Sequence, residues 1–201
     1  IRPVKLKLLD EIKKKCDQYK TLLFLDEIQC GFGRSGKLFS YEWSNIEPDV
    51  MAVAKGIGSG FPMGACLATN KASVGMTKGM HGSTYGGNPL AVSVGKAVIT
   101  EIMSNDFLQK VDNVARYLWK KLKVLENEFG EILEVRGAGL LLGIKTKTNN
   151  QKICALLIEK GLLTVPASDN IVRLSHPLII TNDEVDQAIE IINNVIKGIN
   201  D

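Results

Sequence analysis

The sequence predicts an α/β protein in which a mainly parallel sheet precedes a smaller α+β domain. Two short, uninterrupted apolar runs, at residues 21–25 and 50–54, are typical of parallel strands covered on both faces. Each run ends in charged residues, which is where open α/β sheets bind ligands. Beyond residue 105, short apolar segments alternate with helical patterns. We therefore expect two domains, at residues 1–105 and 106–201.

The first domain is predicted to begin with an amphipathic helix. From Pro3, a good first-turn residue, apolar side chains recur at helical spacing as far as Tyr19, with Asp, Glu and Lys between them. The apolar run at residues 21–25 follows and ends in Asp26 and Glu27. This pattern places a carboxylate at the carboxyl end of a buried strand.

A second predicted strand, at residues 50–54, follows a glycine-rich stretch and ends in Lys55. Residues 65–69 are predicted to form a third strand. A loop then leads into a helix that starts at Pro89, with Asn88 in the position of its N-cap. The lysine therefore occupies the same place in its strand as the carboxylate does in the strand before.

The second domain is predicted to mix helices with short strands. A helical pattern runs from Asp106 to Gly130. The last predicted helix has Thr181 and Glu184 three residues apart at its start, as a capping box requires. The predicted strands are residues 132–136, 140–144, 162–165 and 171–174, and the further helices are residues 151–160 and 182–199. This composition indicates a small α+β domain.

Composition and charge exclude several classes of protein. The 201 residues are 45% hydrophobic, and 25 Lys plus Arg against 22 Asp plus Glu give a net charge of +3 dispersed along the chain. Nucleic acid is therefore not an implied partner. The four cysteines lack the close spacing of zinc or redox sites, so we expect reduced thiols and no metal. We see no transmembrane run and no leader, which predicts a cytoplasmic protein.

The start of the chain suggests a fragment. The first residue is Ile1 instead of Met, and it stands almost directly before a helix. We therefore expect that these 201 residues alone do not catalyse a reaction, even if they fold.

Asp26 and Lys55 are the first residues whose placement suggests a chemical function. Two parallel strands would bring the carboxylate and the amine to one crevice beyond the carboxyl ends of the strands. Pyridoxal phosphate needs such a pair, because a lysine binds it covalently and an acid faces its pyridine nitrogen. For two isolated residues, a structural ion pair is the commoner explanation. The surrounding sequence favours the cofactor.

Three long motifs carry a family resemblance. LFLDEIQCGFGRSG, PDVMAVAKGIGSGFPMGA and HGSTYGGNPLA occur in this order. Together they make the chain similar to class III aminotransferases, which are fold type I enzymes dependent on pyridoxal phosphate. The segments GRSGKLF, AKGIGSGFPMGACLAT and DNIVRL most resemble bacterial acetylornithine aminotransferases. The resemblance implies the later strands of the large, mainly parallel-sheet domain followed by the small C-terminal domain.

The resemblance implies roles for three residues of the first domain. Lys55 would be the lysine that binds the cofactor covalently, and Asp26 would pair with the pyridine nitrogen. Gln29 would donate a hydrogen bond to the phenolic oxygen of the cofactor. The alternative for Gln29 is a solvated polar residue after a strand.

Further residues are assigned by the same resemblance. Thr84, beside Ser83, matches the threonine that reaches the cofactor phosphate of a neighbouring subunit, which implies a homodimer with shared active sites. An ordinary glycine-rich turn is the alternative. Arg173 matches the arginine that binds the substrate α-carboxylate, a task suited to a planar guanidinium. Arg136 precedes a tight turn, and we interpret it as structural.

The resemblance implies a transaminase that moves the amino group of N-acetylornithine to 2-oxoglutarate in arginine biosynthesis. Ornithine, succinyldiaminopimelate and 4-aminobutyrate remain alternative donors, and an inactive truncated remnant is a further alternative. Family members carry an N-terminal half with a phosphate cradle and a ring-stacking aromatic residue, and neither has a counterpart in these residues. Cys30 stands where many family members have threonine.

Overall fold

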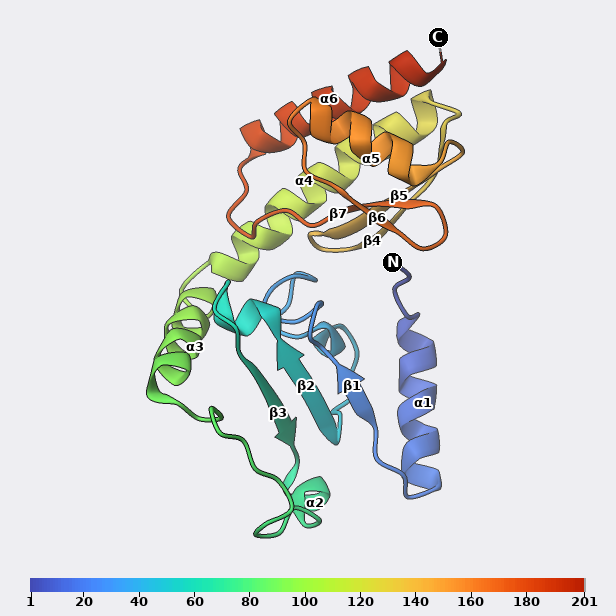
Figure 1. The fold of residues 1–201 in the computed structure, drawn as a ribbon. Coiled ribbons are helices and arrows are strands. Elements are labelled where there is room, and N and C mark those ends of the chain that lie inside the picture. The colour runs from blue at the N-terminus through green and yellow to red at the C-terminus, as the bar shows by residue number, and fades with distance from the viewer. Residues whose placement is uncertain (201) are drawn as a thin grey trace. The chain divides into compact units, whose positions relative to one another are not determined.

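The computed structural model describes residues 1–200, which form two compact units. The first unit spans Val4–Leu108, and the second begins at Gln109 and includes Ile1–Pro3. The predicted domain boundary after residue 105 lies close to this division in the sequence. Figure 1 shows the elements of both units, and each unit is described separately below.

The first unit is built on a three-stranded sheet in the order β1-β2-β3. Its strands are β1 (Phe24–Asp26), β2 (Val50–Ala54) and β3 (Gly64–Ala68). β1 and β2 pair in parallel, as predicted, whereas β3 runs antiparallel to β2. The parallel pair is the one that carries Asp26 and Lys55 at its carboxyl ends.

Five helical segments belong to the first unit. They are α1 (Leu6–Gln18), η1 (Ser40–Trp43), η2 (Lys55–Gly58), α2 (Asn70–Ser73) and α3 (Pro89–Ile102). The predicted start of α3 is confirmed, because Oδ1 of Asn88 accepts a hydrogen bond from the backbone N–H of Ala91 at 2.9 Å. The buried core of the unit consists of Phe32, Met51, Val53, Ile57 and Ile102.

The prediction that the first strand is covered on both faces is wrong for the described chain. Leu23 is buried, but Leu22 and Phe24 are 51% and 56% exposed. Successive side chains of a strand point to opposite faces, so one face of this segment packs inward and the other has no cover from residues 1–200. An apolar run indicates that a strand is suited to burial, but it does not identify the segment that buries it.

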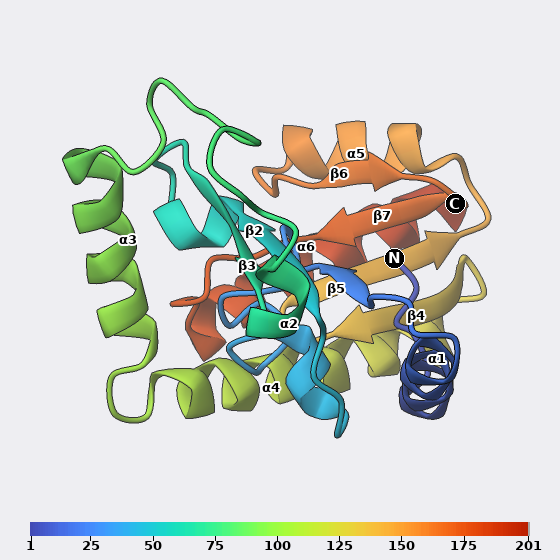
Figure 2. The same ribbon diagram turned by 90° about the horizontal axis from the view of Figure 1, so that it is seen from below.

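The second unit is an antiparallel sheet with helices on one face (Figures 1 and 2). The strand order is β4-β5-β7-β6, and every neighbouring pair is antiparallel. The elements are α4 (Phe107–Glu128), β4 (Ile132–Ala138), β5 (Leu141–Thr146), α5 (Asn150–Glu159), β6 (Val165–Ala167), β7 (Ile171–Leu174) and α6 (Asn182–Asn200). Leu118 and Leu122 of α4 and Leu142 of β5 are fully buried. The predicted α+β organisation is confirmed.

Local signals in the second unit were correct in one place and wrong in another. The capping box is confirmed: the side chain of Glu184 accepts from the backbone N–H of Thr181 at 2.8 Å, and the Thr181 hydroxyl accepts from the backbone N–H of Glu184 at 3.3 Å. The predicted strand at residues 162–165 is displaced, because β6 starts only at Val165. Leu162 lies just beyond the end of α5 and donates its N–H to the carbonyl oxygen of Leu157 within that helix.

Candidate active site

The parallel register of β1 and β2 places Asp26 and Lys55 at the same edge of the sheet. Asp26 is the last residue of β1 and pairs with Ala52, and Lys55 is the first residue after β2. Lys55 has a positive φ of 48°, which is unusual for a residue with a side chain. Such backbone conformations cluster at functional sites. The chain therefore turns sharply where it presents the amine.

Neither charged group is used in an ion pair within residues 1–200. Both residues are exposed. Oδ1 of Asp26 accepts a hydrogen bond from the backbone N–H of Ile28 at 2.9 Å, and the described chain supplies no donor to Oδ2. Lys55 has no carboxylate within ion-pair distance there. The alternative of a structural Asp26–Lys55 ion pair is therefore not what the structure shows.

The turn after β1 is held by a buried carboxylate. Glu27 is 2% exposed, and its Oε1 and Oε2 accept from the backbone N–H of Tyr41 at 2.9 Å and the Cys30 thiol at 3.1 Å. Burial and the nearby Glu27 carboxylate raise the pKa of the Cys30 thiol to about 11, although a hydrogen bond to Ser40 opposes the shift. Gln29 lies exposed within this turn. The sequence analysis overlooked Glu27, although its place in DEIQ beside Asp26 was a signal.

The segment after this turn packs directly on the backbone beside Lys55. Phe32 is 4% exposed with a φ of 54°, and a Cβ built on Gly56 would lie 2.8 Å from the Cβ of Phe32. Real Cβ atoms do not approach so closely, so this contact requires glycine at position 56. The Phe32 ring in turn meets Phe39 edge-on, with centroids 5.6 Å apart.

Ser83 and Thr84 lie in the exposed loop between α2 and α3. The Ser83 hydroxyl accepts a hydrogen bond from the backbone N–H of Gly86 at 2.9 Å, which closes a tight turn. Neither residue forms a hydrogen bond with Asp26 or Lys55 in the described chain. Within residues 1–200, the described contacts do not connect Ser83 or Thr84 with the other cofactor-binding candidates.

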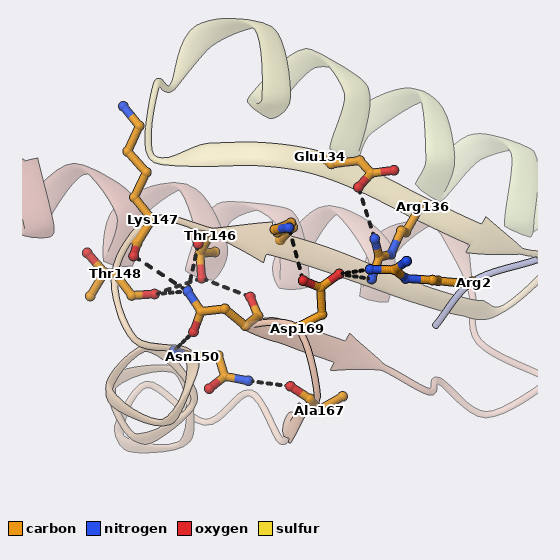
Figure 3. A network of polar contacts seen from close by, with 11 residues as sticks. Arg2, Glu134, Arg136, Thr146, Lys147, Thr148, Asn150, Ala167 and Asp169 are labelled. Atoms are coloured by element: carbon orange, nitrogen blue, oxygen red, sulfur yellow. Dashed lines mark hydrogen bonds and ion pairs between the residues drawn. The ribbon is translucent and has the colours of Figure 1, made fainter.

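Arg173 lies on β7 in the second unit. The register places it opposite Gly143, whose other neighbour in the sheet is Arg136. The guanidinium of Arg136 forms two ion pairs, with Glu134 at 3.1 Å and with Asp169 at 2.8 Å (Figure 3). These ion pairs agree with a structural role for Arg136. Arg173 is partly buried, and its Nε has no hydrogen-bond partner within residues 1–200.

Asp169 is the anion at the centre of the network in Figure 3. It contacts Arg2 at 2.7 Å and Arg136 at 2.8 Å, and Lys145 reaches its other oxygen at 3.0 Å. Hydrogen bonds from Arg2, Arg136 and Lys145 hold the pKa of Asp169 far below its usual value. Asp169 thus links the β6–β7 turn to β4 and β5.

A second, uncharged network supports the strand that carries Arg173. Nδ2 of Asn150 donates to the carbonyl oxygens of Ala167 and Ile171, both at 2.8 Å. Nδ2 of Asn170 donates to the carbonyl oxygen of Thr146 at 2.7 Å. These amides connect the start of α5 to the β6–β7 hairpin. The sequence analysis did not find them, because asparagine near a helix start is common in caps and turns.

Comparison with known proteins identifies the family. A family model described as aminotransferase class-III matches residues 1–196. The chain belongs to the class-III aminotransferases. It is 48% identical over its whole length to the acetylornithine aminotransferase of Mesorhizobium japonicum and covers 51% of that protein. The chain thus spans about half the length of the curated relatives it matches.

Solved structures of class-III aminotransferases share the fold. An ornithine aminotransferase from Plasmodium yoelii is similar with a TM-score of 0.91 and 33% identity, over 96% of this chain and 52% of that one. An N-acetylornithine aminotransferase from Stenotrophomonas maltophilia has a TM-score of 0.87 and 33% identity, over 98% and 52% of the two chains. These likenesses confirm the predicted fold type I architecture.

Class-III aminotransferases use pyridoxal phosphate, and the residues at the sheet edge suit this group. Asp26 offers an exposed carboxylate with one oxygen that accepts nothing from the described chain. Lys55 offers an exposed amine that no described carboxylate neutralises. A partner for the pyridine nitrogen and an amine for covalent attachment are the two groups that the cofactor requires.

Proposed function

We propose that the protein containing this chain is a transaminase that moves the amino group of N-acetylornithine to 2-oxoglutarate, in arginine biosynthesis. One observation carries the proposal: Asp26 and Lys55 follow the carboxyl ends of two parallel strands, and neither forms an ion pair within residues 1–200. Because the chain belongs to the class-III aminotransferases, we assign this pair to the binding of pyridoxal phosphate. The choice of N-acetylornithine is supported by the 48% identity to an acetylornithine aminotransferase.

The residues at the sheet edge have separate roles in this proposal. Bound pyridoxal phosphate supplies an electron sink for the substrate carbon that loses its proton. Lys55 would hold the cofactor covalently, and its amine would be the group that moves the substrate proton. Asp26 would pair with the pyridine nitrogen. Gln29 would donate a hydrogen bond to the phenolic oxygen from the turn that follows β1.

The remaining candidates serve binding and assembly. Arg173 grips the α-carboxylate of the amino donor and of 2-oxoglutarate through two parallel hydrogen bonds. Ser83 and Thr84 bind the cofactor phosphate of a neighbouring subunit, in a cytoplasmic homodimer with shared active sites. Both residues are exposed, so their loop is accessible to a partner subunit.

Ornithine is the second candidate donor. The solved ornithine aminotransferase from Plasmodium yoelii and the N-acetylornithine enzyme from Stenotrophomonas maltophilia are both 33% identical to this chain. The backbone likeness is close in both cases, so the fold does not distinguish the two donors.

A donor panel tests the proposal on the natural full-length protein. Kinetic constants are measured for N-acetylornithine, ornithine, succinyldiaminopimelate and 4-aminobutyrate, each with 2-oxoglutarate. We expect kcat/KM for N-acetylornithine to exceed that of each other donor by about tenfold or more, the discrimination that a binding pocket typically provides. A preference for ornithine would replace the assigned donor. Absence of turnover with all four donors would favour an inactive protein.

A further inference from the structure

Glu27 is a buried charged residue that the proposed chemistry does not use. Only 2% of it is exposed, and both side-chain oxygens accept a hydrogen bond. Its two donors are the backbone N–H of Tyr41 and the thiol of Cys30, and neither is a cation. Burying a carboxylate with only neutral donors is costly. This cost indicates that the bonds of Glu27 serve a purpose at this position.

The backbone and side-chain hydrogen bonds of Glu27 fix the turn that follows Asp26. The backbone N–H of Glu27 donates to the carbonyl oxygen of Ala52 at 2.9 Å, which extends the ladder between β1 and β2. The carbonyl oxygen of Glu27 accepts from the backbone N–H of Gly31 at 3.0 Å, and the side chain receives the Cys30 thiol. Both ends of the turn at residues 27–31 are therefore tied to Glu27.

The same turn orients the carboxylate of Asp26. The backbone N–H of Ile28, inside the turn, donates to Oδ1 of Asp26 at 2.9 Å. A shift of the turn would move this donor and rotate the carboxylate. The donor to Asp26 thus belongs to the same turn as Cys30, whose thiol lies 3.1 Å from Oε2 of Glu27 and 3.5 Å from the carbonyl oxygen of Asp26.

A second path connects Glu27 with the backbone beside Lys55. Tyr41, whose N–H donates to Glu27, lies over Phe39 with ring centroids 6.1 Å apart. Phe39 meets Phe32 at 5.6 Å, and Phe32 packs on Gly56. These contacts therefore connect Asp26 and Lys55 to the same set of packed residues, which includes Glu27.

We propose that Glu27 is a positioning residue that aims the Asp26 carboxylate at the pyridine nitrogen of the cofactor. Its carboxylate closes the turn by accepting from Cys30, and the turn presents the Ile28 N–H that orients Asp26. This inference rests on the proposed function of Asp26. Glu27 does not touch the cofactor and acts only through Asp26.

Two pairs of variants isolate the bond between Glu27 and Cys30 in the natural full-length protein. Glu27→Gln keeps the volume and the acceptor for Tyr41 but loses the charge and one acceptor, so we expect the dissociation constant of pyridoxal phosphate to rise about tenfold. Cys30→Ala removes the same bond from the other side and should shift binding in the same direction. Cys30→Thr keeps a hydroxyl donor and should restore near-normal binding. Glu101→Gln, at an exposed glutamate on α3, is the matched control and should change nothing.

A double-mutant cycle with Asp26→Asn separates positioning from general structural support. Cofactor-free protein is titrated with pyridoxal phosphate and followed by visible absorbance, and its thermal unfolding is recorded in parallel. Glu27→Gln should weaken binding about tenfold beside Asp26 but less than about twofold beside the neutral Asn, because mutations that act through one shared group are not additive.

The possible outcomes are distinct. Equal weakening in both backgrounds would overturn the positioning role and leave the proposed function intact. A wild-type protein that binds no pyridoxal phosphate would overturn the proposed function and this inference together. If Glu27→Gln does not fold, the cycle is run with Cys30→Ala, and additivity there would equally refute the inference.

Discussion

Two adjacent carboxylates, Asp26 and Glu27, have opposite environments. Asp26 is exposed and has one oxygen without a donor in the described chain, whereas Glu27 is buried with both oxygens bonded. Successive residues at the end of a strand point to opposite faces, which separates the two side chains. A carboxyl group can therefore be open to solvent at one position and hold the fold at the next.

Asp26→Asn tests the charge of the proposed nitrogen partner. The neutral amide keeps an oxygen for the N–H of Ile28, so we expect the variant to fold and to retain some cofactor. Because the amide no longer stabilises a protonated pyridine nitrogen, kcat should fall about a hundredfold or more. Steady-state kinetics with saturating pyridoxal phosphate measure the effect. Near-normal turnover would contradict the role of Asp26.

Arg173→Ala tests the proposed contact with the substrate carboxylate. Charge-assisted hydrogen bonds contribute about 1.5 to 3 kcal/mol each, so kcat/KM for amino acids should fall about tenfold or more. Simple amines without an α-carboxylate should be far less affected. Comparing the two substrate classes in one variant controls for damage to the fold. Equal losses for both classes would show that Arg173 is structural.

At the scale of elements, the sequence was informative where a local pattern decides the structure. The helix start at Asn88, the capping box at Thr181 and the strand at Ile171–Leu174 were all predicted from a few neighbouring residues and are confirmed. The parallel pairing of β1 and β2 was also predicted, from the short uninterrupted apolar run in each segment.

Features that depend on distant contacts were not predictable in the same way. The strand predicted at residues 162–165 is one case: Leu162 donates its N–H to the carbonyl oxygen of Leu157 in α5, and β6 begins only at Val165. The bond from Cys30 to Glu27 joins near neighbours, but the bond from Tyr41 spans fourteen residues. The site residues Gln29, Ser83, Thr84 and Arg173 were assigned from the family resemblance, and their roles remain proposals.

Asn150 tests the amide network that supports β7. Asn150→Ala would leave the carbonyl oxygens of Ala167 and Ile171 without this donor in a mostly buried region. We expect the free energy of unfolding of the cofactor-free full-length protein to fall by about 2 kcal/mol, as measured by urea denaturation. Asn113→Ala, at an exposed asparagine on α4, is the control and should cost little. An equal loss in both variants would argue against the network.

At the scale of the whole molecule, the candidate residues are divided between two compact units. Asp26 and Lys55 belong to the first unit, and Arg173 belongs to the second. The chain covers about half of the class-III relatives it matches, so its residues supply part of what those enzymes contain. No helix among residues 1–200 is long and apolar enough to cross a membrane.

The central claim is that Lys55 binds pyridoxal phosphate, and covalent trapping tests it most directly. The natural full-length protein is mixed with pyridoxal phosphate, reduced with borohydride, digested and analysed by peptide mapping. Lys71→Ala, at an exposed lysine on α2, serves as the matched control for Lys55→Ala. We expect the pyridoxyl label on Lys55 in the wild type and the control, and loss of the yellow colour and the label in Lys55→Ala. A label on another lysine, or one that persists in Lys55→Ala, would contradict the account.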